Sequence, residues 1–429
     1  MFLTGKGRFM TKTRRGQRYA ALALGAMFVS AAIGASARTY ENLDRFKGLD
    51  GSDECYPTNL IRDPTTGNLY GTARSCGVGW GMVLKLNKSG KERVLYNFTG
   101  GTDGALPVAG VIRDSAGNLY GTTQEGGDLN CSIGGTVGCG VVFKVDTTGT
   151  ETVLYSFGGG ADGGVPFAGL VRDSAGNLYG TTVQGGDLSG CNGYGCGVVF
   201  KLDPNGMKTV LYTFTGGADG GNPQAGLILD SAGNLYGTTI AGGTMTGSGT
   251  LCAEGCGVVY KVDKTRTETV LYSFTGEADG AIPESGVIRD SAGNLYGTTE
   301  LGGTGQGVVF KVETTGTETV LYTFAGGADG GWPEAAGVIR DSAGNLYGTT
   351  AFGGDLSCNT PYGCGVVFKV DTSGTETVLY SFTGGTDGAF PKTGVIRDPV
   401  GNLYGTTDFG GVGAACNHSG CGVVFTLIP

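Results

Sequence analysis

The chain has 429 residues, 87 of them glycine, and its 38 acidic and 29 basic side chains give a formal net charge of −9. Glycine at about one residue in five argues against a helical protein, because each glycine inside a helix costs about 1 kcal/mol. The glycines follow no three-residue period and 39% of the residues are apolar, which excludes collagen and a disordered linker. The acidic balance opposes binding to nucleic acid or to an anionic membrane surface. A turn-rich, all-β protein remains.

Residues 1–37 are predicted to be a signal peptide. Six basic residues before Tyr19 precede an uncharged run from Tyr19 to Ala37, which ends in Ala-Ser-Ala. This small-x-small ending predicts cleavage between Ala37 and Arg38, and export to the periplasm, the cell surface or the extracellular space. The alternative is a retained membrane anchor, because the run is close to the shortest length that spans a bilayer. No later apolar run approaches membrane length, so no span is expected after cleavage.

A repeat organises the rest of the chain. The string Gly-Asn-Leu-Tyr-Gly-Thr occurs seven times, at intervals of 50 to 60 residues, and each copy lies among four strand-like runs. In the second unit these runs are Gly110–Asp114, Leu119–Thr123, Gly140–Val145 and Glu151–Phe157. Short glycine-containing turns predict two hairpins, and hence a four-stranded antiparallel sheet. Such sheets must cover one another, so residues 38–429 are predicted to form a single seven-bladed β-propeller. The repeats are centred on Asn68, Asn118, Asn177, Asn234, Asn294, Asn345 and Asn402.

The two ends of the repeat region predict how the ring closes. The last unit stops after its third strand, Gly422–Ile428, whereas an extra run, Thr39–Phe46, precedes the first unit in register with the fourth strands. We therefore expect the N-terminal strand to complete the last blade, which removes a free sheet edge.

Charged residues recur at fixed positions in the hairpins. Lys144 is expected to lie directly across from Glu151, and the same spacing in other units predicts a series of weak cross-strand ion pairs. The Asp that opens each Asp-Ser-Ala-Gly-Asn turn is interpreted as an Asx-type cap. Arginines on the innermost strands are expected to pair with a nearby Asp or backbone carbonyl, although a binding funnel is an alternative. They are Arg62, Arg113, Arg172, Arg289, Arg340 and Arg397, with Leu229 at the seventh position.

The twelve cysteines are predicted to form six disulfides. Five pairs fall in the loop between the second and third strands, and both cysteines are missing from the fifth unit, where this loop is short. Joint presence and joint absence is typical of a disulfide that staples one loop in an oxidising compartment. Zinc is disfavoured because pairs spread one per blade do not converge on four ligands. The predicted pairs are Cys55–Cys76, Cys131–Cys139, Cys191–Cys196, Cys252–Cys256, Cys358–Cys364 and Cys416–Cys421.

One face of the ring, which we call the loop face, is expected to carry both the inter-blade loops and the stapled loops. Its acidic and aromatic residues are candidates for ligand binding, since exposed aromatic rings can stack on sugars. Acidic Gly-rich loops can also bind Ca²⁺, but Asp-Gly is a good turn former, and no metal site is predicted. The candidate binding residues are Asp103, Asp162, Asp219, Asp279, Asp329, Asp387, Trp80, Tyr194, Trp332 and Tyr362.

The unit Arg-Asp-Ser-Ala-Gly-Asn-Leu-Tyr-Gly-Thr-Thr, followed by Gly-Val-Val-Phe-Lys-Val and Glu-Thr-Val-Leu-Tyr-Ser-Phe, resembles the GloVer tandem repeat of exported bacterial proteins. The resemblance covers about residues 39–429. It implies export and a tandem β architecture, and it brings no catalytic residues with it.

Two classes of function remain open. The first is an exported, non-enzymatic propeller that acts as a scaffold or multivalent binding module for a glycan, a protein or a cell-envelope component through its loop face. The alternative is a propeller enzyme that hydrolyses or cleaves extracellular polysaccharide in the central funnel. Catalysis needs unlike groups at one place, whereas these blades are close copies, so binding is favoured. The only histidine, His418, is interpreted as a solvated loop residue. No catalytic residue or cofactor is predicted, and the oligomeric state is left open.

Overall fold

The computed structural model describes residues 38–45, 55–76, 78–244, 252, 254–334, 337–411 and 420–429. Within these ranges the chain forms strands β1 to β29 and one short 3-10 turn, η1 (Cys191–Gly193), between β12 and β13. The predicted signal peptide, its cleavage site at Ala37, and His418 lie outside the described residues or at their boundary.

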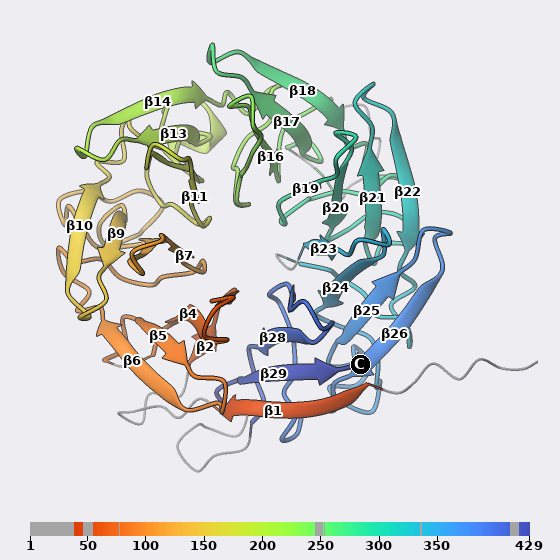
Figure 1. Cartoon of the computed structure of the whole chain (residues 1–429). Helices are drawn as coiled ribbons and strands as arrows, with labels where there is room; N and C mark the ends of the chain where they lie inside the picture. Colours follow the sequence, from red (N-terminus) through yellow and green to blue (C-terminus); the bar gives the residue numbers. More distant parts are fainter. Residues whose placement is uncertain are drawn as a thin grey trace, which may run out of the picture. The chain divides into compact units, whose positions relative to one another are not determined.

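The strands form seven antiparallel sheets that follow one another around a ring (Figure 1), which confirms the predicted seven-bladed propeller. From the innermost strand outward, blade 1 consists of β3 (Ile61–Arg62), β4 (Leu69–Arg74), β5 (Met82–Leu86) and β6 (Glu92–Asn97). Blade 2 consists of β7 (Ile112–Arg113), β8 (Leu119–Thr123), β9 (Val141–Val145) and β10 (Glu151–Ser156). Blade 3 consists of β11 (Val171–Arg172), β12 (Leu178–Thr182), β13 (Val198–Leu202) and β14 (Lys208–Thr213). An additional short strand, β2 (Tyr56–Pro57), also pairs with β4.

Blades 4 to 6 repeat the same order. Blade 4 consists of β15 (Ile228–Leu229), β16 (Leu235–Thr239), β17 (Val258–Val262) and β18 (Glu268–Ser273). Blade 5 consists of β19 (Ile288–Arg289), β20 (Leu295–Thr299), β21 (Val308–Val312) and β22 (Glu318–Thr323). Blade 6 consists of β23 (Val338–Arg340), β24 (Leu346–Thr350), β25 (Val366–Val370) and β26 (Glu376–Ser381).

Blade 7 closes the ring with both ends of the chain. It consists of β27 (Ile396–Arg397), β28 (Leu403–Thr407), β29 (Val423–Ile428) and, as its outermost strand, β1 (Thr39–Arg45). The pairing of β1 with β29 is antiparallel and runs from Thr39 opposite Ile428 to Arg45 opposite Val423. The N-terminal strand therefore completes the last blade, as predicted from the phase of the repeats.

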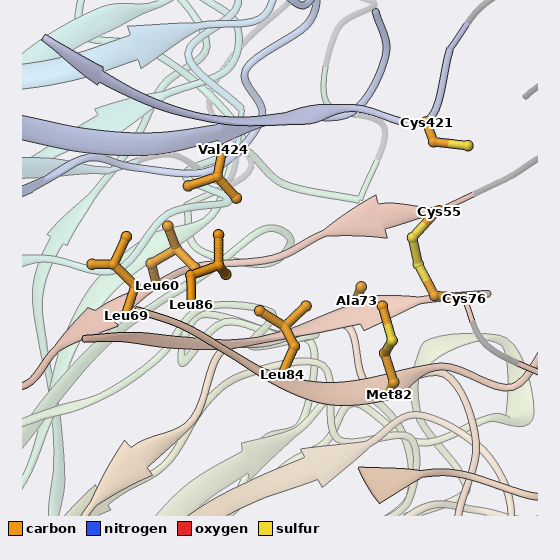
Figure 2. Close-up of a cluster of buried hydrophobic side chains, with 10 residues drawn as sticks. All are labelled: Cys55, Leu60, Leu69, Ala73, Cys76, Met82, Leu84, Leu86, Cys421 and Val424. Atoms are coloured by element: carbon orange, nitrogen blue, oxygen red, sulfur yellow. A yellow bond between two sulfur atoms is a disulfide. The ribbon is translucent and has the colours of Figure 1, made fainter. Parts of the chain in front are cut away.

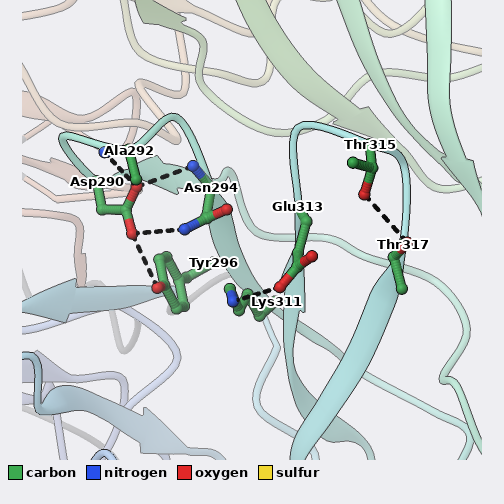
Figure 3. A network of polar contacts seen from close by, with 8 residues as sticks. All are labelled: Asp290, Ala292, Asn294, Tyr296, Lys311, Glu313, Thr315 and Thr317. Atoms are coloured by element: carbon green, nitrogen blue, oxygen red, sulfur yellow. Dashed lines mark hydrogen bonds and ion pairs between the residues drawn. The ribbon is translucent and has the colours of Figure 1, made fainter.

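The first hairpin of each blade is held by the aspartate that opens its turn. In Figure 3, Asp290 accepts hydrogen bonds from the backbone N–H groups of Ala292 and Asn294, from the Asn294 amide and from the Tyr296 hydroxyl. Burial alone would raise the pKa of the Asp290 carboxyl, but the hydrogen bonds from Asn294 and Tyr296 outweigh it and lower the pKa. The interpretation of this aspartate as an Asx-type cap is confirmed.

Aromatic side chains pack each blade against the next. Phe157, which follows the outermost strand of blade 2, is fully buried and meets Phe200 of blade 3 edge to face, with ring centroids 5.3 Å apart. Within a blade, Gly121 lies opposite Phe143, and a Cβ added there would come within 2.6 Å of the ring. The glycine of the Leu-Tyr-Gly-Thr motif is thus required by the close approach of this ring.

The interface between blade 7 and blade 1 is packed by aliphatic side chains instead. Figure 2 shows Val424 of β29 against the leucines of blade 1, in a cluster whose members are all less than 10% exposed. Buried aliphatic contacts of this kind contribute about 1.5–3 kcal/mol per side chain. The cluster is Cys55, Leu60, Leu69, Ala73, Cys76, Met82, Leu84, Leu86, Cys421 and Val424.

Five of the predicted disulfides are present, with Cα–Cα distances of 4.7 to 5.7 Å. The sixth predicted pair includes Cys416, which lies outside the described residues. The five bonds join Cys55 to Cys76, Cys131 to Cys139, Cys191 to Cys196, Cys252 to Cys256 and Cys358 to Cys364.

The predicted cross-strand ion pairs are wrong by one residue of register. Lys144 lies opposite Thr152, and Glu151 lies opposite Val145, because the turn contains five residues with Asp146 bonded to Thr150. A shift of one residue places two side chains on opposite faces of a sheet, so the lysine and the glutamate point apart. The same offset recurs in blades 1 and 3 to 6.

The glutamates instead face the preceding blade. Burial raises the pKa of Glu151 to about 7, and the negative charge of Asp103 in the preceding inter-blade loop adds to the effect. In blade 3 this position is Lys208, whose ammonium group donates to the carbonyl of Asp162. In blade 7 the hydroxyl of Tyr40 donates to the carbonyl of Asp387 at 2.7 Å.

The innermost arginines also connect neighbouring blades. The Arg113 guanidinium lies 5.6 Å from the ring centroid of Tyr70 in the preceding blade and 3.6 Å from the carboxylate of Asp63. Among the described residues only this arginine of the set forms an ion pair, so the expected pairing with a nearby Asp is replaced in most blades by a cation–π contact. The contacts are Arg62–Tyr404, Arg113–Tyr70, Arg172–Tyr120, Arg289–Tyr236, Arg340–Tyr296 and Arg397–Tyr347.

Candidate functional site

The inter-blade aspartates that were predicted as binding residues accept hydrogen bonds from the adjoining strand and from their own loops. Asp279 accepts hydrogen bonds from the Tyr272 hydroxyl at 2.9 Å, from the Thr275 backbone N–H at 2.8 Å and from the Thr275 hydroxyl at 2.5 Å. A tyrosine and a backbone N–H make the same contacts at the other five positions. These are Asp103, Asp162, Asp219, Asp329 and Asp387. Ligand binding by these carboxylates therefore stays a prediction.

The structure brings two of the four predicted aromatic residues into one group. Trp332 and Tyr362 both contact Phe352, with ring centroids 4.9 and 6.0 Å apart. Trp80 and Tyr194 are 41% and 48% exposed and belong to blades 1 and 3. No ring contact between described residues joins either of them to this group.

The residues that follow the inter-blade prolines converge on one cavity of about 270 Å³. Because every blade contributes one of them, the cavity lies on the axis of the propeller, and we call it the channel mouth. In contrast to the proline before it, this position differs from blade to blade. From blade 1 to blade 7 it is occupied by Thr58, Val108, Phe167, Gln224, Glu284, Glu334 and Lys392.

A strained backbone position presents these side chains. Val165, just before Pro166, has a φ of +58°, a region that β-branched residues rarely adopt and that costs about 1–2 kcal/mol. Its N–H donates to the carbonyl of Cys139 at 2.9 Å, and its own carbonyl accepts from the N–H of Val183 at 3.1 Å. Corresponding residues in five further blades have a φ of +54° to +56°. They are Leu106, Asn222, Ile282, Trp332 and Phe390.

The disulfides brace this position. The carbonyl that holds the strained residue belongs to the second cysteine of the stapled loop in the preceding blade, as with Cys139 and Val165. Gly140, the next residue, has a φ of +87°, and a Cβ there would come within 2.6 Å of Pro166 Cδ. The stapled loops therefore support the channel mouth. The same contact joins Cys196 to Asn222, Cys256 to Ile282 and Cys364 to Phe390.

A second variable position lies beside the first, at the exit of each second strand, where its N–H bonds to the strained residue in six blades. Its occupants, from blade 1 to blade 7, are Arg74, Gln124, Val183, Ile240, Glu300, Ala351 and Asp408. When the two variable positions are taken together, charged residues occur only in blades 5, 6, 7 and 1. Blades 2, 3 and 4 contribute only apolar side chains and glutamines. Of the second set, only Arg74 and Asp408 line the cavity. The mouth is therefore charged on one side and largely apolar on the other.

The charged side contains one ion pair and additional carboxyl groups. Lys392 Nζ lies 2.9 Å from Glu334 Oε2. Burial would lower the pKa of Lys392, but Glu334 and then Asp408 outweigh it and raise the pKa. Burial raises the pKa of Asp408 to about 7, although Lys392 and Arg74 act in the opposite direction. The Arg74 guanidinium lies 5.0 Å from the ring centroid of Tyr56.

Blade 5 adds two glutamates to this side. Burial raises the pKa of Glu284 to about 7, and the negative charges of Glu300 and Glu334 add to the effect. Burial, followed by Glu334, also raises the pKa of Glu300. Carboxyl groups with perturbed pKa values that line a cavity, here Glu284 and Asp408, are typical of functional sites.

The channel continues inward from the mouth. A second cavity of about 320 Å³ shares Val108, Phe167, Gln224 and Glu284 with the first. Its remaining lining is almost entirely apolar or glycine, from the residues just before and within the innermost strands. The charged side chains that line this channel are thus concentrated at the mouth.

Sequence reasoning missed this site because the blades were treated as close copies. The signal was present: the residue after each proline changes from Thr58 to Val108, Phe167 and onward, while the proline itself recurs. The described residues contain no group of three or more His, Cys, Asp or Glu side chains placed to hold a metal ion, and the calcium alternative stays untested. In the described ranges no helix is long and apolar enough to cross a membrane.

A family model described as the Gloeobacter/Verrucomicrobia repeat matches residues 4–252 and 245–429. No curated protein sequence gives a significant match. Among solved structures, the chain is similar to a gluconolactonase from Xanthomonas campestris, with 12% identity, a TM-score of 0.40, and coverage of 91% of this chain and 89% of that one. It is also similar to the PQQ-bound aldose sugar dehydrogenase from Streptomyces coelicolor, with 12% identity, a TM-score of 0.42, and coverage of 91% and 98%. Likeness at this level carries no argument about activity.

Proposed function

Since the chain belongs to the Gloeobacter/Verrucomicrobia repeat family over nearly its whole length, we propose that it is an exported binding propeller that holds a glycan at the channel mouth. The observation that carries this proposal is the convergence of unlike side chains on one axial cavity in an otherwise repetitive molecule. Ligand sites combine apolar or aromatic walls with a few placed polar groups. Phe167 on one side and Glu334 with Lys392 on the other fit that description.

Export is supported by two features of the chain. The basic and then uncharged sequence of residues 1–37 has the form of a signal peptide. Five disulfides in a chain of this size are expected only in an oxidising compartment. We expect the mature protein to begin at Arg38 and to act in the periplasm, at the cell surface or outside the cell.

A glycan array probed with the purified exported protein tests the binding function, followed by titration of the best ligand into two variants of blade 3. Phe167 lines the mouth, whereas Tyr194 is 48% exposed in the stapled loop of the same blade. We expect Phe167→Ala to weaken binding at least about tenfold, the loss of roughly 1.4 kcal/mol, and Tyr194→Ala to leave it unchanged. The reverse result would place the ligand on the outer loops, and an array without any bound glycan would refute the proposal.

A second candidate function is acid–base catalysis at the same mouth, because unlike groups do converge there and the similarity of the blades elsewhere no longer argues against catalysis. It is favoured by the carboxyl groups of Glu284 and Asp408, whose pKa values of about 7 suit proton transfer near neutral pH. If the protein cleaves a bound polysaccharide, we expect Asp408→Asn to reduce kcat and to change the pH profile. Unaltered ligand after prolonged incubation would leave binding as the function.

A further inference from the structure

The charge on the mouth carries an inference about the ligand, which rests on the proposed binding function. Three carboxyl groups line the charged side of the cavity, a fourth interacts with them electrostatically from beside it, and only two cations accompany them. The acids are Glu284, Glu300, Glu334 and Asp408, and the cations are Lys392 and Arg74.

The two cations compensate these acids only in part. Lys392 is bound to Glu334, and Arg74 lies over the ring of Tyr56. Among the described residues, no hydrogen bond or ion pair is found for the carboxyl groups of Glu284, Glu300 and Asp408. The charged side of the mouth therefore has unmet capacity to accept hydrogen bonds from a positively charged group.

The carboxyls are raised in pKa because burial and mutual repulsion oppose their ionised forms. A positive charge placed among them would relieve both effects, since an opposite charge within about 4–6 Å favours the ionised form of an acid. A carboxylate also makes a stronger hydrogen bond to an ammonium group than to a neutral hydroxyl.

The opposite side of the mouth constrains the rest of the ligand. Phe167 belongs to blade 3, which lies across the seven-bladed ring from blades 6 and 7, and Val108 of blade 2 is its neighbour in the lining. A cavity of about 270 Å³ is at the small end of the range for ligand pockets. A single ring with an apolar face and one cationic edge fits both the size and the division of the lining.

We infer that the channel mouth binds an amino-sugar residue of a glycan, with its ammonium group between Glu284 and Asp408 and its ring against Phe167. The free amine is the distinguishing feature, because N-acetylation removes its charge while keeping the sugar ring. Recognition would thus depend on deacetylated positions of the glycan.

Titration calorimetry with three trisaccharides tests this inference: a glucosamine trimer, its N-acetylated form and a glucose trimer. We expect the glucosamine trimer to bind at least about tenfold more tightly than the other two, and to weaken as salt screens the charges. Glu284→Gln should remove this preference. Glu277→Gln is the matched control, because Glu277 is exposed in the same inter-blade loop and does not line the cavity.

Asp408→Asn provides a second variant should Glu284→Gln fold poorly, which circular dichroism would reveal, because Asp408 is the other carboxyl assigned to the ammonium group and also lines the cavity. Equal binding of the charged and acetylated trimers, lost in the Phe167→Ala variant, would overturn the amino-sugar inference and leave the binding function intact. A preference for the amine that persists in both the Glu284→Gln and the Asp408→Asn variants would overturn the assignment of the carboxyls. Absence of binding by every glycan would remove both proposals.

Discussion

Glu318 offers a sharp test of how the blades are held together. It begins the outermost strand of blade 5, faces Asp279 of the preceding loop, and has an oxygen, Oε1, that is buried without a hydrogen-bond partner among the described residues. At the equivalent position of two other blades, Lys208 and Tyr40 donate to the carbonyl of the inter-blade aspartate. The interface therefore favours a donor, which a protonated glutamic acid supplies and a carboxylate does not.

Burial, followed by the charge of Asp279, raises the pKa of Glu318 from 4.5 to about 7. Because the folded state binds the proton more tightly than the unfolded state, the stabilisation is fully present below pH 4.5 and is lost as the pH rises to about 7. A difference of about 2.5 pH units corresponds to about 3.4 kcal/mol. Since Glu318 is only half-buried, solvent screening reduces this to roughly 1 kcal/mol.

Glu318→Gln cannot ionise and keeps a donor, so we expect it to raise the free energy of unfolding by roughly 1 kcal/mol at pH 8 and to change it little at pH 4. Urea unfolding of the disulfide-intact protein at both pH values measures this. Lys208→Glu is the matched opposite, because it introduces the same acid into blade 3 and should destabilise the protein at pH 8 more than at pH 4. A glutamine variant that is less stable at pH 8 than the parent would refute the reasoning.

Three further outcomes follow from the structure. Replacing Cys131 and Cys139 together with serine should lower the free energy of unfolding by about 2–3 kcal/mol in urea; an unchanged midpoint would mean that the staple adds nothing. Tyr296→Phe removes the hydroxyl that donates to Asp290 at 3.0 Å and should cost about 1 kcal/mol in the same assay, whereas a neutral effect would contradict the role given to this turn. Mass spectrometry of the exported protein should find Arg38 at its N-terminus, and an intact residue 1 would exclude cleavage.

The architecture could be predicted from the sequence because its determinants are local and recur. Three of these determinants can be recognised directly in the repeated sequence. They are the turn in which Asp290 binds Asn294 and Tyr296, the glycine opposite Phe143, and the phase of the repeat that pairs β1 with β29. The register of the second hairpin could not be read in this way. Its turn holds five residues instead of four, and that single residue moved the partner of Lys144 from Glu151 to Thr152.

The channel mouth escaped prediction for a different reason. Its residues are about 50 to 60 positions apart in sequence, and each follows a proline in a loop whose sequence is typical of a turn. Only closure of the ring places Val108 and Lys392 around one cavity. The backbone at these loops also adopts the left-handed region at non-glycine residues such as Val165, which residue preferences argue against.

Comparison of the seven repeats with one another distinguishes the residues that build the scaffold from those that line the candidate site. Positions that recur in nearly every blade, such as the turn aspartate and the glycine opposite the aromatic ring, have a structural explanation. The side chains that follow the prolines differ, whereas the backbone hydrogen bonds that position these loops are made by the residue before the proline, as with the N–H of Val165 and the carbonyl of Cys139. A change at Val108 or Gln224 therefore alters the lining of the mouth without removing a contact that holds the ring together. The lining of the mouth can therefore vary, one blade at a time, on an unchanged frame.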